Sequence, residues 1–378
     1  MNILEVSDTG GVGTGHMGPV TNVVYQLVNS FALLGQDIKL VDAKSVKKRT
    51  LHQDVKLIET NTTGWPRNSE WPVLKQFVKE LVALDLSNFD IIHVHSRPIA
   101  QILYNKYGVK CVYTSHTPTW CDPSLNPYEK FKNILQILRG NHEYNVIKKL
   151  DLTIALGDFL KKSIKGAKIT VIPNGIDARQ YIYVNNSRSM LDLSEDKFIV
   201  LFVGRFVPIK GVHVLLEAIN SLNLDNLRVI IIGRTNSGKG MDEYAESLNK
   251  IAQDLPVQFT GFISNKSETF SQYLSAADLL VVPSLFDNQA SVVLEGLAMN
   301  LPVIASKVGG ISQMINNNVG MLFEPGNSEE LSELISYLYK NPDVCRRMSK
   351  NAREHVEANF NWENCAKKHL AAFRNVIQ

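Results

Sequence analysis

Two cationic side chains stand where a strand-like run gives way to a helix-like run in the second half of the chain. Arg205 follows the apolar run Ile199–Val203, and Lys210 comes just before the next helical pattern. Such a turn directs backbone N–H groups and the positive end of a helix dipole at a bound anion. Two cations there can neutralise a diphosphate. The pattern G-R-x-x-x-x-K-G therefore indicates a phosphate site, although a surface arginine and lysine would give the same pattern.

Two carboxylates follow the later apolar run Leu279–Val282. Asp287 lies in the polar loop after that run, and Glu295 lies within the helix that comes next. Carboxylates so placed can accept hydrogen bonds from sugar and ribose hydroxyl groups. Acidic residues are common, so this spacing alone is a weak signal.

One histidine of the first half lies just past a strand-like run. His116 follows the run Val109–Tyr113 and precedes Pro118. A histidine at a strand end that faces a cleft can hydrogen-bond a substrate or transfer a proton. For a lone histidine a structural role is the commoner one.

Short apolar runs alternate with helical patterns along the whole chain. Continuous apolar runs are expected of strands in a parallel sheet that helices cover on both faces. The first series of predicted strands is Ile3–Val6, Ile38–Val41, Ile91–Val94, Val109–Tyr113, Leu152–Ala155 and Thr170–Ile172, with a helical stripe over Val23–Leu34. The second series is Ile199–Val203, Val229–Ile232, Val257–Phe259, Leu279–Val282 and Val303–Ala305, with a helix at Glu329–Tyr339.

A turn at Pro173-Asn174-Gly175 and the polar stretch Asn185–Lys197 separate the two series. We interpret the polar stretch as an interdomain linker. The pattern predicts an α/β fold of two doubly wound domains, residues 1–185 and 190–355, with the ligand site in the cleft between them. A further helical stripe follows Trp362 at the end of the chain.

Two glycine-rich segments suggest other functions. Gly13–Gly18 matches G-x-G-x-x-G between a strand and a helix, and Asp42 ends the next strand, as in a dinucleotide site. The residues Ser7–Val12 make that turn too long for a close match, and any phosphate could use the same loop. Gly233–Gly240 resembles a P-loop but ends on glycine where a magnesium-binding hydroxyl is needed. We interpret it as a basic surface loop.

Composition and charge exclude several classes of protein. The 378 residues are 44% apolar and 20% charged with a net charge of +3, so charge does not favour nucleic acid. No CxxC occurs, and no run approaches membrane-spanning length. We predict free thiols and a cytoplasmic protein that is at most peripherally attached to the inner membrane face. The basic cluster Lys44–Arg49 is an ordinary solvated face or a contact to an anionic surface or acceptor.

The ordered series of motifs resembles the retaining GT-B glycosyltransferases of family 4, the glycosyl transferase group 1 family. The resemblance covers nearly the whole chain and is more specific than any one motif. It rests on Gly18-Pro19, Gly35–Ile38, Pro173–Asp177, Val203–Arg205 with Lys210-Gly211, Gly261–Ser264, Ala277–Leu279, Pro283-Ser284, Asp287–Glu295, Ser306–Gly310, Gly320–Phe323 and Phe360–Trp362.

The resemblance implies a hexosyltransferase-type enzyme of class EC 2.4, with no cofactor and no metal. It would move a sugar from a UDP- or GDP-linked donor to a hydroxyl acceptor, such as a sugar, a lipid-linked saccharide or a polyol, in glycan, glycolipid or cell-surface saccharide synthesis. The remaining alternatives are an NAD(P)- or flavin-dependent oxidoreductase on the Gly13–Gly18 loop and a non-catalytic sugar-nucleotide binder. The resemblance also implies that the last helix, from about residue 359 to 378, crosses back onto the first domain.

The resemblance assigns roles to individual residues. Arg205 and Lys210 would neutralise the donor diphosphate, Glu295 would hold the ribose, Asp287 would lie by the donor sugar and His116 near the reacting carbon. The donor site would further include Gly15, Gly18, Gly204, Gly233, Ile263, Asn288, Gln289, Ala290 and Ser291. Two departures stand out: the family's usual first acid is glutamate where this chain has Asp287, and the N-terminal glycine loop is longer than usual.

Overall fold

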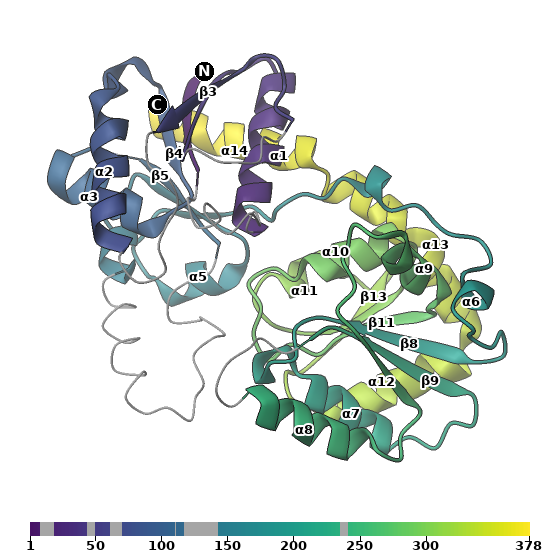
Figure 1. Cartoon of the computed structure of the whole chain (residues 1–378). Helices are drawn as coiled ribbons and strands as arrows, with labels where there is room; N and C mark the ends of the chain where they lie inside the picture. The colour runs from purple at the N-terminus through teal and green to yellow at the C-terminus, as the bar shows by residue number, and fades with distance from the viewer. Residues whose placement is uncertain (8–18, 44–49, 61–69, 110, 117–142, 235–240) are drawn as a thin grey trace. The chain divides into compact units, whose positions relative to one another are not determined.

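The chain forms two compact units. The computed structural model describes residues 1–7, 19–43, 50–60, 70–109, 111–116, 143–234 and 241–378 (Figure 1). Met1–Gly175 together with Trp362–Gln378 makes unit 1, and Ile176–Asn361 makes unit 2. Each unit is a doubly wound α/β layer structure, as the alternation of apolar runs and helical stripes predicts.

Unit 1 is built on a parallel sheet with the strand order β3-β2-β1-β4-β5-β6-β7. Its strands are β1 (Asn2–Val6), β2 (Asp37–Ala43), β3 (Val55–Thr60), β4 (Ile91–Val94), β5 (Val112–Ser115), β6 (Leu152–Ala155) and β7 (Ile169–Val171). The structure adds β3 to the predicted strands. That strand is at the edge of the sheet and has only its two end residues buried, so its sequence lacks the continuous apolar run on which the prediction depended.

Helices cover both faces of this sheet, because successive strand residues point to opposite faces. Ile3 packs toward the cluster that contains α1 and α14, whereas Leu4 packs toward the cluster that contains α2, α3 and α5. These helices are α1 (Pro19–Leu33), α2 (Glu70–Ala83), α3 (Arg97–Tyr107), α5 (Asp158–Ser163) and α14 (Trp362–Ile377).

The C-terminal helix α14 belongs to unit 1 although unit 2 precedes it in the chain. Its side chains Ala366, Leu370 and Phe373 are buried in the same cluster as Phe31 of α1. The helices α1 and α14 lie side by side (Figure 1). The rings of Phe31 and Phe373 lie 5.9 Å apart. This is the helix for which the family resemblance implies a return to the first domain.

Unit 2 is built on a second parallel sheet with the order β10-β9-β8-β11-β12-β13. Its strands are β8 (Phe198–Val203), β9 (Leu227–Ile232), β10 (Val257–Gly261), β11 (Leu279–Val282), β12 (Val303–Ser306) and β13 (Gly320–Phe323). Chain order reverses between β8 and β11, which are neighbours in the sheet. Open α/β sheets bind their ligands outside the carboxyl ends of the strands at such a reversal.

Two helical layers complete unit 2. One face of the sheet is covered by α9 (Glu268–Ala276), α10 (Ser291–Ala298), α11 (Ile311–Met314) and α13 (Pro342–Asn359). The other face is covered by α7 (Val212–Asn220), α8 (Met241–Ala252) and α12 (Ser328–Lys340). The strand sequences are apolar on both faces for this reason.

The stretch Asn185–Lys197, interpreted above as a linker, lies inside unit 2, and the change of unit comes earlier, after Gly175. This stretch contains the short helix α6 (Ser187–Met190). The Arg188 guanidinium donates to the Asp278 carboxylate at 2.8 Å and to the Ala276 carbonyl at 3.0 Å. The polar composition of the stretch Asn185–Lys197 therefore reflects hydrogen bonds to the rest of unit 2 as well as solvent exposure.

Candidate active site

The cationic and acidic residues of unit 2 lie at the carboxyl ends of two neighbouring strands. Arg205 follows β8 and is exposed, and Lys210 ends the short 3-10 helix η5 (Pro208–Lys210) just before α7. Asp287 follows β11, the neighbour of β8. The sheet order thus places all three at the point of unit 2 where its chain order reverses.

Glycine at position 211 allows the β8–α7 loop to approach the β11 loop closely. Gly211 has a φ of +69°, and a Cβ atom there would lie 1.8 Å from the carbonyl oxygen of Pro283. The two loops are also joined by the amide of Leu285, which donates to the carbonyl of Ile209 at 2.8 Å. Any side chain at position 211 would force them apart.

The close approach brings Lys210 and Asp287 into contact. The Lys210 ammonium donates to the Asp287 carboxylate, and the two side chains are only 23% and 13% exposed. The sequence suggested separate roles for these residues, one on the diphosphate and one on the sugar. The structure joins them as an ion pair, so an anion that binds Lys210 would share that cation with Asp287.

Glu295 is nearly buried within α10, with 6% of its surface exposed. Burial raises the pKa of its carboxyl group, and the hydrogen bonds that the carboxylate accepts offset only part of the rise. The donors are Asn265, Tyr181 and Ser291. These hydrogen bonds fix the orientation of the Glu295 side chain, whose carboxylate oxygens can accept further hydrogen bonds from a ligand.

Tyr181 is a residue that sequence reasoning missed. Burial raises the pKa of its phenol, and the nearby charge of Glu295 raises it further. Tyr181 follows the 3-10 helix η4 (Ala178–Gln180), whose N-terminus is capped by the Asp177 side chain. The motif Pro173–Asp177 was noted in the sequence, and its capping aspartate was the available signal for this turn.

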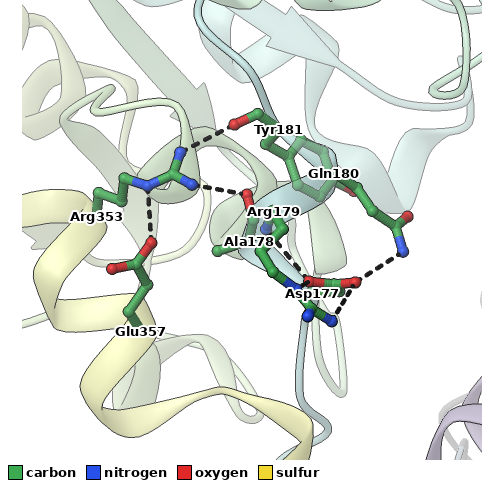
Figure 2. Close-up of polar contacts among 7 residues, drawn as sticks. All are labelled: Asp177, Ala178, Arg179, Gln180, Tyr181, Arg353 and Glu357. Atoms are coloured by element: carbon green, nitrogen blue, oxygen red, sulfur yellow. Dashed lines mark hydrogen bonds and ion pairs between the residues drawn. The ribbon is translucent and has the colours of Figure 1, made fainter.

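Arg353 of α13 fixes the backbone around Tyr181, as Figure 2 shows. Its guanidinium donates to the carbonyl of Tyr181 at 2.9 Å and to the carbonyl of Ala178 at 3.0 Å. It also donates to the carbonyl of Ala298 at the end of α10 at 2.9 Å and pairs with Glu357. Arg353 therefore ties the Tyr181 segment to the helix that carries Glu295.

Two predicted glycines of the donor site line the gap between neighbouring strand ends. A Cβ atom at Gly233 would lie 1.8 Å from the carbonyl oxygen of Gly204. The Gly204 amide donates to the carbonyl of Ile232 at 3.0 Å. Glycine at position 233 thus keeps the ends of β8 and β9 close.

The other predicted donor residues lie on two loops of unit 2. Ile263 is half-buried after β10, Asn288 and Ala290 are buried, Gln289 is half-buried, and Ser291 is exposed in the first turn of α10. The Asn288 carbonyl accepts a hydrogen bond from the Gly310 amide at 2.8 Å. Gly15 and Gly18 lie outside the described residues.

His116, the predicted site residue of the first half, follows β5 in unit 1 and is partly exposed. Its Nε2 atom lies 2.8 Å from Nδ1 of His95. Burial holds the pKa of His116 well below its usual value, and the electrostatic effect of the neighbouring histidines lowers it further. A neutral imidazole at this position can accept or donate one hydrogen bond with each nitrogen.

Glu5, His93 and His95 form a compact cluster beside His116. Their ligand-type atoms lie within 4.8 Å of one another, a spacing that a metal ion could bridge. Hydrogen bonds within the cluster account for the same spacing without an ion.

Within the described ranges, every helix is too short or too polar to span a lipid bilayer. The cysteines in the described part of the chain, Cys111, Cys345 and Cys365, are buried free thiols. The basic cluster Lys44–Arg49 lies outside the described ranges.

Comparison with known proteins identifies the class of enzyme. The family model described as "Glycosyltransferase Family 4" matches residues 20–180, and the model "Glycosyl transferases group 1" matches residues 184–355. The chain is 25% identical over 326 residues to a D-inositol 3-phosphate glycosyltransferase of Nocardioides sp., which covers 79% of this chain and 70% of that protein.

Solved structures show the same fold. Sucrose-phosphate synthase from Thermosynechococcus elongatus superposes with a TM-score of 0.80 at 23% identity, covering 100% of this chain and 99% of that one. Anabaena HepE in complex with UDP and glucose gives a TM-score of 0.72 at 19% identity, covering 99% of each chain. The fold is that of the GT-B glycosyltransferases. The chain belongs to the family 4 glycosyltransferases, the glycosyl transferase group 1 family.

Proposed function

We propose that this glycosyltransferase moves a hexosyl group from a UDP- or GDP-linked sugar to a hydroxyl acceptor, with retention of anomeric configuration and without a metal ion. The observation that carries the proposal is the position of Arg205 and Lys210 at the carboxyl end of β8, where unit 2 reverses its chain order. A donor diphosphate at this edge would meet two cations and the N-terminus of α7.

The chemistry of the reaction explains why two cations matter. As the glycosidic bond breaks, positive charge develops on the anomeric carbon and negative charge on the departing diphosphate. Arg205 and Lys210 would stabilise the negative charge, and such electrostatic stabilisation is often the largest single contribution to catalysis. We expect the leaving phosphate, rather than a side chain, to take the proton of the acceptor hydroxyl.

Unit 2 also has carboxylates that can accept hydrogen bonds from the ribose and the sugar of the nucleotide-sugar donor. The carboxylate of Glu295, fixed by Tyr181 and Asn265, suits the paired hydroxyl groups of a ribose. Asp287 beside Lys210 suits a sugar hydroxyl next to the diphosphate. The bound UDP and glucose of Anabaena HepE support a uridine donor for a protein of this fold.

The acceptor is proposed at the level of a hydroxyl group. The relatives include D-inositol 3-phosphate glycosyltransferases and a lipopolysaccharide 1,2-N-acetylglucosaminetransferase of Salmonella typhimurium. Their names cover a phosphorylated polyol and a lipid-linked saccharide. Both acceptor types are among those expected from the sequence. We further propose that the enzyme is cytoplasmic, with peripheral contact to the membrane.

The oxidoreductase alternative has less support. It needs the Asp42 carboxylate for a ribose hydroxyl, but Asp42 is only 4% exposed and accepts a hydrogen bond from the Tyr25 hydroxyl at 3.1 Å. The non-catalytic alternative depends on Asp287 in place of glutamate. Turnover of the donor would exclude it.

A thermal-shift panel of nucleotide sugars tests the proposal. A true donor at one hundred times its dissociation constant should stabilise the protein by about 2.7 kcal/mol, and mismatched donors should give smaller shifts. Hydrolysis of the stabilising donor without added acceptor should follow. Stabilisation by NAD(P) or a flavin, with none by any nucleotide sugar, would refute the proposed function.

A further inference from the structure

A chain of polar side chains runs across the centre of the unit 1 sheet and ends at His116. Glu5 on β1 and His93 on β4 are paired in the sheet register. His95 comes two residues after His93 and so projects to the same face. Glu5 and His93 are fully buried, and His95 is 4% exposed. Buried polar groups of this kind must satisfy one another's hydrogen bonds.

The contacts form two arms that start at the Glu5 carboxylate. In one arm Glu5 Oε1 contacts His95 Nε2, and His95 Nδ1 lies 2.8 Å from His116 Nε2. In the other arm Glu5 Oε2 lies 3.1 Å from His93 Nδ1, and His93 Nε2 lies 2.7 Å from the Thr114 hydroxyl. The first arm ends on the histidine that the sequence selects for the site, whereas the second ends inside the sheet.

The donor and acceptor roles along the first arm follow from the carboxylate. An ionised carboxylate only accepts, so His95 Nε2 must carry the proton. Neutral His95 then has a bare Nδ1, which can only accept, so His116 must donate from Nε2. A neutral His116 is left with an unprotonated Nδ1. In each neutral ring, the hydrogen bond that one nitrogen makes thus decides whether the other nitrogen is protonated.

The electrostatics of the cluster agree with these protonation states. Burial opposes ionisation of Glu5, but the electrostatic attraction and the hydrogen bonds of His93 and His95 outweigh it and lower its pKa to about 2. Burial lowers the pKa of His95 and of His116, which favours the neutral rings. His93 contacts Glu5 and Thr114 and takes no part in the first arm.

We propose that Glu5 and His95 are positioning residues that hold His116 as the neutral Nε2–H tautomer and fix the orientation of its ring at the end of β5. The proposal rests on the proposed function in one respect, the contact of His116 with substrate. Glu5 and His95 act only through His116. Stacking also supports a fixed orientation of His116, because its ring lies nearly parallel to the ring of His95, with the ring centroids 5.1 Å apart.

Nitrogen NMR of the full-length protein, labelled with ¹⁵N-histidine, tests the tautomers directly and needs no enzymatic activity. At pH 7.5 we expect His95 and His116 each to be protonated on Nε2 and bare on Nδ1, with a slowly exchanging Nε2 proton on His116. A His116 variant assigns its resonance. A wild-type His116 protonated on Nδ1, or a stoichiometric metal ion on the cluster by elemental analysis, would overturn the proposal.

His95→Phe breaks the link to His116 while keeping a ring of similar shape. We expect the His116 Nε2–H signal to be lost to solvent exchange and kcat to fall about tenfold or more, with the donor KM within about twofold, because a small misplacement of a reacting group is costly. Thr114→Val is the matched control. It removes the hydroxyl of the second arm and should leave both the His116 signal and kcat close to wild type.

The outcomes separate the two proposals. A folded His95→Phe protein with wild-type kcat and an unchanged His116 spectrum would refute the positioning role and leave the transferase function intact. The expected tautomers in a wild-type protein that transfers no sugar would refute the proposed function alone. If His95→Phe does not fold, the wild-type tautomer measurement still decides.

Discussion

Lys210→Ala tests the proposed phosphate site most sharply, because the structure gives Lys210 two separable roles. Its ammonium neutralises Asp287 in the protein itself, and we propose that it also stabilises the leaving diphosphate. The first role concerns the stability of unit 2. The second concerns the rate of sugar transfer.

The burial of the ion pair sets the expected loss of stability. Removing one partner of a fully buried pair costs about 3–5 kcal/mol, whereas an exposed pair contributes about 0–1 kcal/mol. With side chains 23% and 13% exposed, this pair lies between those limits. We expect Lys210→Ala to lower the free energy of unfolding by about 1–3 kcal/mol, because it leaves the Asp287 carboxylate partly buried without its cation.

Lys210→Ala should also slow catalysis, through an effect on kcat that is separate from the loss of stability. Loss of one group that stabilises developing charge costs about a hundredfold in kcat, or about 2.7 kcal/mol of activation free energy. The loss should appear in kcat rather than only in KM, because only interactions that strengthen in the transition state accelerate the step.

A double-mutant cycle with Asp287→Asn distinguishes the two roles. In urea unfolding, the double variant should regain most of the stability that Lys210→Ala loses, because no uncompensated charge remains. In steady-state kinetics with the identified donor, the double variant should stay about a hundredfold slower than Asp287→Asn alone. Lys367→Ala, which removes an exposed helical pair with Glu363, is the control and should change neither quantity appreciably. A double variant with the kcat of Asp287→Asn would show that Lys210 serves only to neutralise Asp287.

Glu295→Gln should raise the donor KM about tenfold with kcat within about threefold, since ribose is remote from the reacting carbon; a fall in kcat at unchanged KM, in the same donor titrations, would contradict this role. His369, fully buried in α14, has its pKa lowered to about 3, mainly by burial. The stability that neutral His369 contributes is present above pH 6.5 and is lost as pH falls toward 3. Between pH 7 and pH 5, the free energy of unfolding of the wild type should therefore fall by about 2 kcal/mol more than that of His369→Leu. Equal losses for the two proteins in urea titrations would show that His369 is not involved. Transfer activity should survive saturating EDTA in a radiolabelled-donor assay; loss that manganese or magnesium restores would overturn metal independence.

Local patterns in the sequence were enough to predict the class of fold. The apolar runs Ile91–Val94 and Leu279–Val282 are strands with the predicted bounds. Such runs mark strands buried on both faces, and that property is decided by residues adjacent in the chain. The order of motifs along the chain likewise sufficed for the family, because each motif is local.

Contacts between distant parts of the chain required the tertiary structure. The Lys210–Asp287 pair spans 77 positions and depends on the order of β8 and β11 and on the space that Gly211 leaves at Pro283. No spacing in the sequence shows which strands become neighbours.

The cluster that ends at His116 has the same origin. Glu5 and His95 are 90 positions apart, and they meet because β1 and β4 lie side by side at the point where the sheet of unit 1 reverses its chain order. The sequence by itself determined the residue types and the strands that carry them. Only the packing of those strands decided that a carboxylate, two histidines and His116 share one buried chain of hydrogen bonds, because strand order is settled by the helices and core that the whole unit buries together.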